Sequence, residues 1–362
     1  KETNHLRAVN RRHRCLAPEE KPAHNPAMIA AVRFRNFKAL REAAVRLEPF
    51  NLFIGPNGSG KTSLIQALLR LRTLAGRPAI HASEPKDLKP SGPQIELHFA
   101  PPFQNIRVTL GCNSDEPVCN LLVVDHPPGI ASEGEWEELR TRLQGIRAFL
   151  FDHHAMALPA KRSDGAELAS NAGNLAAVLA RRREQVPAAM DLLEEDFRRI
   201  LPEFAGLDFG AAGDGRVELA ARLAGSNERV AADSLSQGTL CLLATLALAH
   251  APAPPTVVCL EEADRGVHPR LLREVCDALY RLSYPRDAGL ERAPVQVIAT
   301  THSPYLLDQF REHPEEVVLA SKHGNAATFM RLSERPDLLD LMKDAHLGDL
   351  WYSGILGGVP GD

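Results

Sequence analysis

The sequence predicts an α/β fold in which several strands carry polar residues at their carboxyl ends. Three stretches support this prediction. Phe50 to Ile65 (FNLFIGPNGSGKTSLI) joins an apolar strand to a helix through a glycine-rich loop. Thr256 to Glu262 (TVVCLEE) is an apolar strand that ends in two carboxylates, and Val295 to Thr300 is another that leads into Thr301-His302-Ser303-Pro304. In open α/β sheets, ligands bind at this end of the strands.

The glycine-rich loop fits GxxxxGK[ST], the phosphate-binding P-loop, with the flanking strand and helix that this motif requires. Its glycines let backbone N–H groups turn inward around a polyphosphate, and the helix presents the positive end of its dipole. Lys61 would reach the β- and γ-phosphates, and Thr62 would bind Mg²⁺ through its hydroxyl. The loop residues predicted to bind nucleotide are Asn57, Gly58, Ser59, Gly60, Lys61, Thr62 and Ser63. The alternative is a loop that only turns the chain.

Length and composition are those of a globular protein. The chain has 362 residues and a formal net charge of −4. No apolar run approaches the ~18 residues that a membrane helix needs, and no signal peptide is visible, so we expect a cytoplasmic protein with no membrane partner. The six cysteines show no CxxC spacing, which favours reduced, mostly buried thiols over a zinc site or disulfides.

Residues 1–27 differ from the remainder in charge. They hold six Lys or Arg against three Glu, a local charge of +3 that leaves −7 elsewhere. The segment has no apolar periodicity, whereas Met28 opens a well-patterned strand. We therefore expect 1–27 to be a disordered or non-native arm. A basic arm can hold a phosphate backbone, but a bland tail is the simpler interpretation.

Apolar periodicity predicts the other elements in chain order. We expect strands over 28–37, 44–54, 94–100, 105–112, 118–125 and 146–151, two short strands within 204–223, and helices over 135–144, 165–183, 187–200 and 240–250. The strands over 94–125 would form an antiparallel layer. No helix sustains the heptads of a long coiled coil, so the insertion before 233 should be compact. His153 and His154 lack carboxylates at ligand spacing, which argues against a metal there.

The two carboxylates at the tip of the 256–262 strand have the arrangement that Mg²⁺-dependent hydrolysis needs. Glu261 would serve the Mg²⁺ shell, and Glu262 would polarise the attacking water. Two acids that only cap a sheet edge are the alternative. His302 ends the next strand, one βα unit later, and would face the same ligand.

These motifs together resemble the RecF, SMC and OLD-like branch of the ABC-type ATPases. The resemblance spans roughly 28–358. It rests on the P-loop, on EEADRGVHP at 261–269 (similar to DEPExGLHP), on TTHSP at 300–304, on DSLSQGT at 233–239 (similar to the LSGGQ signature), and on 164–179 and 346–358. It implies a P-loop NTPase fold of ABC-ATPase type, with a mixed sheet, an antiparallel β layer and a short helical insertion. It also implies ATP and Mg²⁺ as ligands.

The resemblance assigns roles to residues at both ends of the nucleotide. Asn36, Phe37 and Lys38 would lie near the base, although without the resemblance Phe37 would be a core residue and Lys38 a solvated one. His302 would sense the γ-phosphate by hydrogen bonding and act with Glu262 in catalysis.

The resemblance also implies a second subunit. Ser236 and Gly238, at a helix N-terminus, would grip the γ-phosphate of ATP bound to another protomer, which implies a head-to-tail homodimer with ATP at the interface. No glutamine is securely placed as the Q-loop residue, and Gln94 and Gln104 fit by order alone.

The chain departs from the family pattern beside the carboxylates. Glu261 replaces Asp, Ala263 replaces Pro and Val267 replaces Leu. Because Mg²⁺ is geometrically strict, the extra methylene of Glu261 would slow turnover if this residue binds the ion directly. An outer-shell role through water would tolerate it.

The predicted organisation is one ATPase domain over 28–362. Its parts are an N-terminal lobe (28–125), a helical and β insertion (126–232), a lobe with the signature and the carboxylates (233–333) and a tail (334–362).

The expected function is an ATPase that dimerises around ATP and drives or regulates a DNA-directed process, in DNA repair or antiviral (anti-phage) defence, through a separate effector such as a nuclease or toxin. The alternative is an ATP-dependent scaffold or switch with little hydrolysis that holds a partner protein. Direct DNA binding rests on the resemblance and on the arginines at 181–183. A transporter motor fits badly, because 175 residues separate Lys61 from Ser236.

Overall fold

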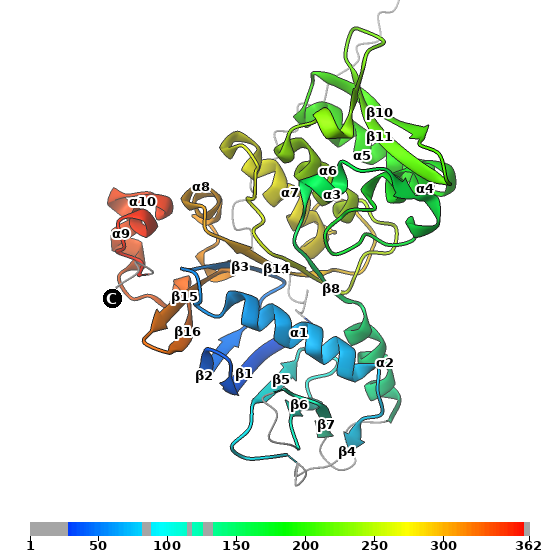
Figure 1. Ribbon diagram of the computed structural model, residues 1–362. Coiled ribbons are helices and arrows are strands. Elements are labelled where there is room, and N and C mark those ends of the chain that lie inside the picture. The colour runs from blue at the N-terminus through cyan, green and yellow to red at the C-terminus, as the bar shows by residue number, and fades with distance from the viewer. Residues whose placement is uncertain (1–27, 82–87, 114–117, 126–132, 358–362) are drawn as a thin grey trace, which may run out of the picture.

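The computed structural model describes residues 28–81, 88–113, 118–125 and 133–357, and these form three β-sheets with helices between and beside them (Figure 1). The first sheet has the strand order β2-β1-β5-β6-β7-β4 and is antiparallel except for the β4–β7 pair. Its strands are β1 (Ile29–Phe37), β2 (Leu40–Arg46), β4 (Ile80–His81), β5 (Gln94–Phe99), β6 (Arg107–Gly111) and β7 (Leu121–Asp125). The expected antiparallel layer is thus confirmed.

The second sheet is central and has the order β16-β15-β3-β14-β13-β8. Its strands are β3 (Phe50–Ile54), β8 (Ile146–Phe149), β13 (Val257–Leu260), β14 (Gln296–Thr301), β15 (Val317–His323) and β16 (Ala326–Arg331). All pairs are parallel except β15–β16, so the sheet is mixed. Strands β3, β13 and β14 are buried along their whole length, as expected where both faces of a sheet are covered.

Helix α1 (Lys61–Ala75) lies between the first sheet and the central sheet (Figure 1). Its buried leucines share one hydrophobic cluster with β1, β5 and Phe53 of β3. The other apolar side chains of β3, at Phe50, Leu52 and Ile54, belong to a second cluster on the opposite face. Strand β3 therefore stands between two cores, which holds the loop that follows it in place.

A buried glutamine joins the first sheet to the central one. Gln296, at the start of β14, is 3% exposed. Its Oε1 accepts a hydrogen bond from the N–H of Ile29 at 3.0 Å, and its Nε2 donates to the carbonyls of Ile29 and Glu48 at 2.9 and 3.1 Å. The amino ends of β1 and β14 are thus fixed side by side.

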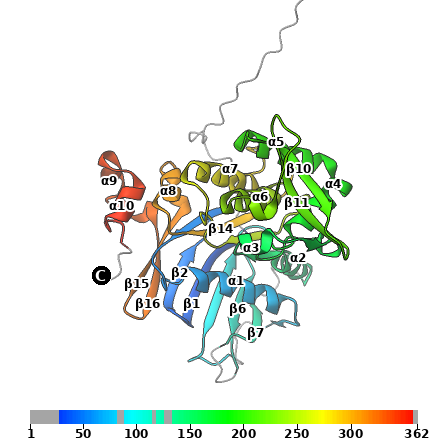
Figure 2. The ribbon, with the colours of Figure 1, turned by 45° about the horizontal axis from the view of Figure 1, so that its top comes forward.

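The insertion and the second half of the chain cover the other face of the central sheet (Figure 2). The third sheet contains β9 (Ala160–Lys161), β10 (Phe204–Ala211), β11 (Arg216–Leu223) and β12 (Arg229–Ala231). The helices on this face are α3 (His153–Met156), α4 (Leu175–Gln185), α5 (Pro187–Ile200), α6 (Gln237–Ala249) and α7 (Leu272–Ser283). Helix α2 (Glu133–Gln144) packs instead on α1, on the side of the first sheet. Within the described ranges, no helix is long and apolar enough to cross a membrane.

Two expected elements have different bounds in the structure. The strand expected over 44–54 is wrong, because β2 and β3 belong to different sheets and Pro49 lies between them. The turn is closed by Asn51, whose Oδ1 accepts from the N–H of Glu48 at 2.9 Å. The helix expected from residue 165 begins only at Leu175, because Asn174 donates to the carbonyls of Asp164 and Glu167 and holds that stretch as a loop.

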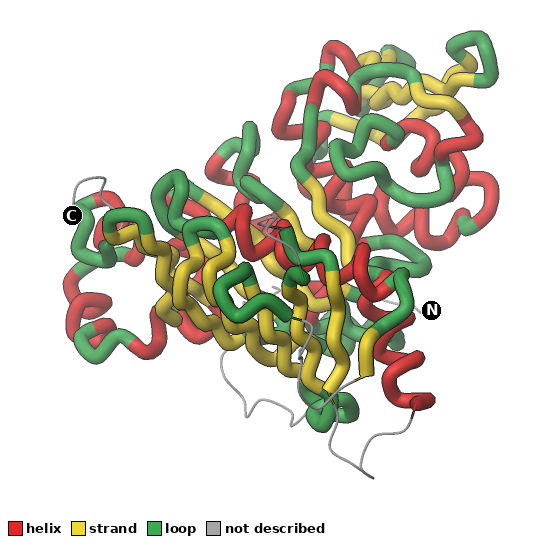
Figure 3. The backbone as a smooth tube through the Cα atoms, turned by 60° about the horizontal axis from the view of Figure 1, so that its bottom comes forward, coloured by secondary structure: helices red, strands yellow, loops and turns green. Residues whose placement is uncertain are grey.

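The C-terminal part contains a hairpin that periodicity did not predict. Strands β15 and β16 extend one side of the central sheet, next to α8 (Pro304–Leu307), α9 (Leu338–Asp344) and α10 (Leu347–Tyr352) (Figures 1 and 3). Because β15 pairs with β3 in parallel, the chain leaving β15 emerges beside the glycine-rich loop.

The cysteines that the structure describes are buried, and none of them is bonded to another in a disulfide. They are Cys112, Cys119, Cys241, Cys259 and Cys276, and Cys15 lies outside the described residues. Burial raises the pKa of the Cys119 and Cys241 thiols to about 11. These side chains therefore stay protonated and behave as small apolar residues.

A cluster of charged side chains links α5, α7 and the residue that follows α6. Asp196 of α5 accepts from His250, which follows α6, at 2.8 Å, and it also pairs with Arg281 of α7. Burial alone would raise the pKa of Asp196, but the hydrogen bonds and charges of His250 and Arg281 outweigh burial and hold that pKa well below its usual range. Asp196 is therefore ionised in the folded chain.

We expect Asp196→Asn to lower the free energy of unfolding by about 3 kcal/mol, because it leaves the partly buried Arg281 without its carboxylate partner. A carboxylate with a depressed pKa stabilises the fold above its unfolded pKa of about 4 and loses this contribution as pH falls. Wild type should therefore lose stability below about pH 4 more steeply than the variant. Urea unfolding at several pH values checks this. Asp340→Asn, in an exposed pair with Lys343, should change little.

Candidate nucleotide-binding and active site

The parallel strands of the central sheet bring the predicted site residues to one edge. In the strand register, Ile54 of β3 lies beside Thr301 of β14, and Ala299 of β14 lies beside Leu260 of β13. The P-loop, His302 and the Glu261-Glu262 pair follow these three strands directly. The structure therefore places the P-loop, both carboxylates and His302 at the carboxyl edge of a single sheet, where ligands of α/β folds bind.

The P-loop has the backbone conformation that its glycines permit. Gly58 and Gly60 have φ values of +76° and +92°, in the left-handed region that other residues adopt rarely. Helix α1 begins at Lys61, and no side chain caps its N-terminus. The N–H groups of the first turn, among them those of Thr62 and Ser63, therefore have no partner within the helix and can bind an anion.

Lys61 is folded onto its own loop. Its Nζ donates to the carbonyls of Gly55 and Pro56 at 2.6 and 2.9 Å. Burial lowers the pKa of this ammonium to about 8, and the negative charges of Glu262 and Glu261 oppose the decrease. A triphosphate would add negative charge beside the ammonium and favour its protonated form.

Thr62 and Glu261 meet across the site. The Thr62 hydroxyl donates to Oε2 of Glu261 at 2.8 Å, although 199 residues separate them in the chain. A hydroxyl and a carboxylate oxygen are the hard donors that Mg²⁺ prefers. The longer side chain of Glu261 thus reaches the P-loop threonine, and the residues present fit a Mg²⁺ ion held between them with phosphate oxygens and water.

Glu261→Gln is expected to raise the Mg²⁺ concentration for half-maximal turnover about tenfold or more, because the amide removes the negative charge beside the ion. Glu261→Asp keeps that charge and should change it less. Turnover measured against Mg²⁺ at saturating ATP compares the three proteins. An unchanged Mg²⁺ requirement in Glu261→Gln would remove Glu261 from the metal site.

Glu262 is held in an unusual backbone conformation. Its φ is +51°, which costs a residue other than glycine about 1–2 kcal/mol. Its N–H donates to Oγ1 of Thr300 at 3.0 Å, and its carboxylate, 48% exposed, lies 3.6 Å from Arg265. The backbone strain therefore directs an accessible carboxylate to the edge of the sheet, where a water molecule can reach it.

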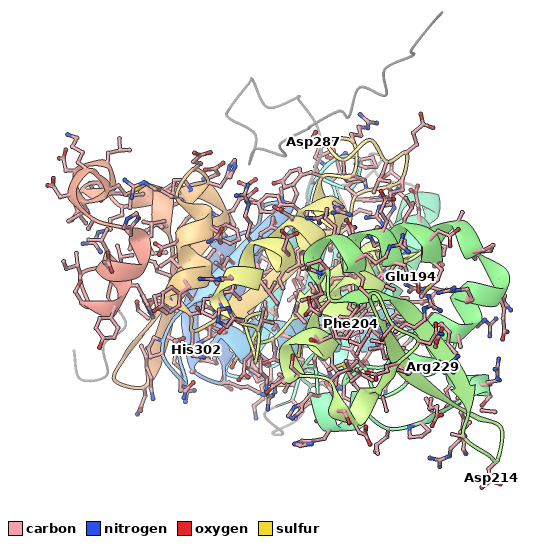
Figure 4. The ribbon with its side chains drawn as sticks, turned by 90° about the horizontal axis from the view of Figure 1, so that it is seen from above. Glu194, Phe204, Asp214, Arg229, Asp287 and His302 are labelled. Atoms are coloured by element: carbon pink, nitrogen blue, oxygen red, sulfur yellow. The ribbon has the colours of Figure 1, made fainter. Side chains whose placement is uncertain are left out.

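His302 is exposed beside these groups. Burial of part of the ring lowers its pKa, and the charge of Lys61 lowers it further, against the opposing effect of Asp264 and Glu262. The imidazole is therefore neutral at neutral pH and can exchange hydrogen bonds with a phosphate. In Figure 4, His302 lies well away from Glu194, Phe204 and Arg229 of the insertion.

The predicted base-contacting residues lie at the end of β1 and in the turn that leads to β2. Asn36 and Lys38 have φ values of +53° and +55°. The Phe37 ring is only 6% exposed and stacks on Phe34 with centroids 6.1 Å apart. Lys38 is exposed and donates to Gln66 of α1. Phe37 thus packs in the core, while Asn36 and Lys38 remain at the surface near the helix that follows the P-loop.

The signature residues, Ser236 and Gly238, lie at the start of α6. Ser236 caps α6, because its Oγ accepts from the N–H of Thr239 at 3.1 Å. A Cβ on Gly238 would lie 2.8 Å from the carbonyl oxygen of Gly266, which follows the carboxylate pair. Among the described residues, no hydrogen bond joins Ser236 or Gly238 to the P-loop. The structure therefore does not unite the signature with the P-loop of the same chain.

Neither candidate for the Q-loop residue lies on the central sheet, whose edge carries the P-loop. Gln94 opens β5, and Gln104 lies between β5 and β6, so both belong to the first sheet. A different segment, the one that follows β8, does begin at the site edge. At the end of β8, the carbonyl oxygen of Phe149 accepts a hydrogen bond from the N–H of Glu261 at 2.8 Å.

The β15–β16 hairpin packs directly on the P-loop and was missed by sequence reasoning. A Cβ on Gly55 would lie 2.1 Å from the carbonyl oxygen of Ala320, and one on Gly60 would lie 3.3 Å from Cβ of Ala327. In the β15 sequence VVLASKH, apolar and polar residues alternate poorly. Its apolar start was therefore the only sequence signal for a strand. Through this hairpin Lys322 also reaches the loop.

Comparisons with known proteins agree with this geometry. A family model described as "AAA domain, putative AbiEii toxin, Type IV TA system" matches residues 50–308. The chain is similar to an Smc head bound to the C-winged helix domain of ScpA, with 17% identity, a TM-score of 0.55 and coverage of 87% of this chain and 99% of that one.

A second solved structure gives the same result. It is the Smc head domain with an extended coiled coil, bound to the C-terminal domain of ScpA, from Pyrococcus furiosus, with 14% identity, a TM-score of 0.51 and coverage of 87% and 99%. At these identities the likeness shows the fold. No curated protein matches the chain.

Proposed function

This chain belongs to the family of AAA domains whose model it matches over 50–308 and has the fold of an ABC- or SMC-like P-loop ATPase, and on that basis we propose that it binds ATP with Mg²⁺ and hydrolyses it. Five residues would serve the reaction: Lys61, Thr62, Glu261, Glu262 and His302. Mg²⁺, when bound, neutralises charge on the triphosphate.

One observation carries this proposal. The hydroxyl of Thr62 and the carboxylate of Glu261 meet at 2.8 Å, which joins the P-loop to the tip of β13. The next residue, Glu262, then stands beside the position of the terminal phosphate and can accept a proton from water. Lys61 would leave the carbonyls of Gly55 and Pro56 and bind phosphate oxygens instead.

The second part of the proposal is an ATP-bound homodimer. The N-terminus of α6, at Ser236 and Gly238, would bind a phosphate through its helix dipole and N–H groups. Within the described residues, it makes no hydrogen bond to its own P-loop. A head-to-tail dimer would supply the signature of one protomer to the nucleotide of the other. Each ATP would then be enclosed between two chains.

The third part is a separate partner that the ATPase drives in a DNA-directed process such as repair or antiviral defence. The similar Smc heads are bound to domains of ScpA, which supports a role for a separate protein here. The arginines at 181–183 give little support to direct DNA binding. Arg182 donates to the carbonyl of Ala247, and Arg183 pairs with Glu194 at 2.7 Å; only Arg181 is exposed.

The test combines two measurements on wild type. One is steady-state ATP hydrolysis, and the other is molar mass from light scattering with ATP, with ADP and without nucleotide. Mg²⁺-dependent turnover and a dimer that forms only with ATP are expected. A dimer without measurable turnover would favour the scaffold or switch instead. Duplex DNA at low salt, where phosphate contacts are strongest, is added in parallel, and unchanged mass and turnover there would count against DNA as a direct ligand.

A further inference from the structure

The β15–β16 hairpin brings a fifth strand end to the nucleotide edge. Strand β15 runs parallel to β3, with Leu319 beside Ile54. Ala320 then lies level with Gly55, where its carbonyl oxygen is in close contact, and the next residues run alongside the P-loop. The carboxyl edge of the sheet is therefore longer than the P-loop, the carboxylates and His302 alone indicate.

Lys322 is the charged residue that this strand contributes. Its side chain is exposed, and its Nζ and Cδ lie 3.6 and 3.8 Å from the position that a Cβ on Gly58 would take. Because Gly58 has no side chain, nothing from that residue separates the ammonium from the loop backbone. The flexible stem of a lysine lets the ammonium move by several ångströms from this starting position.

Lys322 also differs from the other lysines at the site in its contacts. Lys61 is held by the carbonyls of its own loop, and Lys38 donates to Gln66. For Lys322, no hydrogen bond or ion pair is formed with any residue that the structure describes. Its charge is therefore available to an anion without first breaking a contact.

We propose that Lys322 is a positioning residue for the nucleotide, a second cation that attracts and orients the polyphosphate held by the P-loop. This inference rests on the proposed function. The backbone N–H groups of the loop and the N-terminus of α1 already favour a polyanion, and an adjacent ammonium strengthens the positive potential there. Because the site rim is open to water, the contribution is moderate and sensitive to salt.

Titration with a fluorescent ATP analogue (mant-ATP) tests the proposal on four proteins: wild type, Lys322→Gln, Lys322→Arg and Lys343→Gln. Lys343 is an exposed lysine of α9 and serves as the matched control. We expect Lys322→Gln to weaken binding about five- to tenfold at low salt and to flatten the dependence of Kd on salt. Lys322→Arg and Lys343→Gln should keep a Kd within about twofold of wild type, and Lys343→Gln should also leave kcat unchanged.

Two results would overturn the proposal while leaving the proposed function intact. One is a Kd and a salt dependence in Lys322→Gln that match wild type. The other is normal ATP affinity with loss of the ATP-dependent dimer, which would place Lys322 against the partner subunit. If wild type itself does not bind mant-ATP, the proposed function fails first, and the inference fails with it. Thermal melting of all four proteins confirms that they are folded.

Discussion

Glu262→Gln is expected to lower steady-state ATP turnover by about 10²- to 10⁴-fold while ATP binding persists. The amide keeps the size of the side chain and the hydrogen bond from the Glu262 N–H to Thr300, but it cannot accept a proton from water. Lys61 and the P-loop are unchanged. Because ATP then stays intact, the ATP-bound dimer should accumulate, whereas wild type should return to monomer as ATP is consumed.

The measurement is phosphate release together with molar mass over time after ATP addition. Glu203→Gln, at an exposed glutamate between α5 and β10, is the matched control and should behave as wild type. Turnover retained in Glu262→Gln would show that another group activates the water. A dimer equally stable in wild type and variant would instead favour the ATP-dependent scaffold.

Gly55→Ala should weaken ATP binding by about 100-fold or more. The backbone of Gly55 is compatible with alanine, so the obstacle is steric. An added Cβ would lie 2.1 Å from the backbone carbonyl oxygen of Ala320, 2.8 Å from Oγ of Ser59 and 2.9 Å from Cβ of Ala320. A strand backbone cannot move aside as a flexible side chain can, so the P-loop must shift instead. Overpacking of this kind also destabilises the fold by about 1–3 kcal/mol.

Gly76→Ala is the control that separates the steric effect at Gly55 from the effect of any glycine-to-alanine change on ATP affinity and stability. Gly76 directly follows α1, and the nearest atom to an added Cβ is the Thr73 carbonyl oxygen at an ordinary 3.4 Å. Mant-ATP affinity and urea unfolding of both variants give the comparison. Normal affinity in Gly55→Ala would mean that β15 can give way, and that the hairpin does not hold the loop in position.

Much of the candidate site could be predicted because its residues follow strands with strong local signals. The apolar runs before Gly55, Glu261 and Thr301 identify three buried parallel strands, and such strands place their carboxyl ends together. Helix α5 begins with Pro187 and ends before Pro202, so both of its bounds were also evident from local chemistry.

The remainder depends on contacts between distant residues. The side chain of Asn174 holds the preceding residues in a loop, through hydrogen bonds that compete with helix formation. The apolar periodicity of the sequence does not reveal these hydrogen bonds. Strand β15 gains its place from pairing with β3, more than 260 residues earlier in the chain. The burial of Phe37 follows from the packing of the first sheet on α1. Such tertiary interactions can override the secondary-structure propensity of a segment, and the local sequence pattern does not contain them.

The hydrogen bonds between Gln296 and Ile29 bear on the design of the experiments above. They fix the start of the described chain at the amino end of β14, whereas His302 follows the carboxyl end of the same strand. A strand of six residues spans about 17 Å. A fluorophore or surface tether attached at Met28 would therefore sit on the side of the sheet opposite the nucleotide edge. Labelled protein could then report on nucleotide binding without its label obstructing the P-loop or His302.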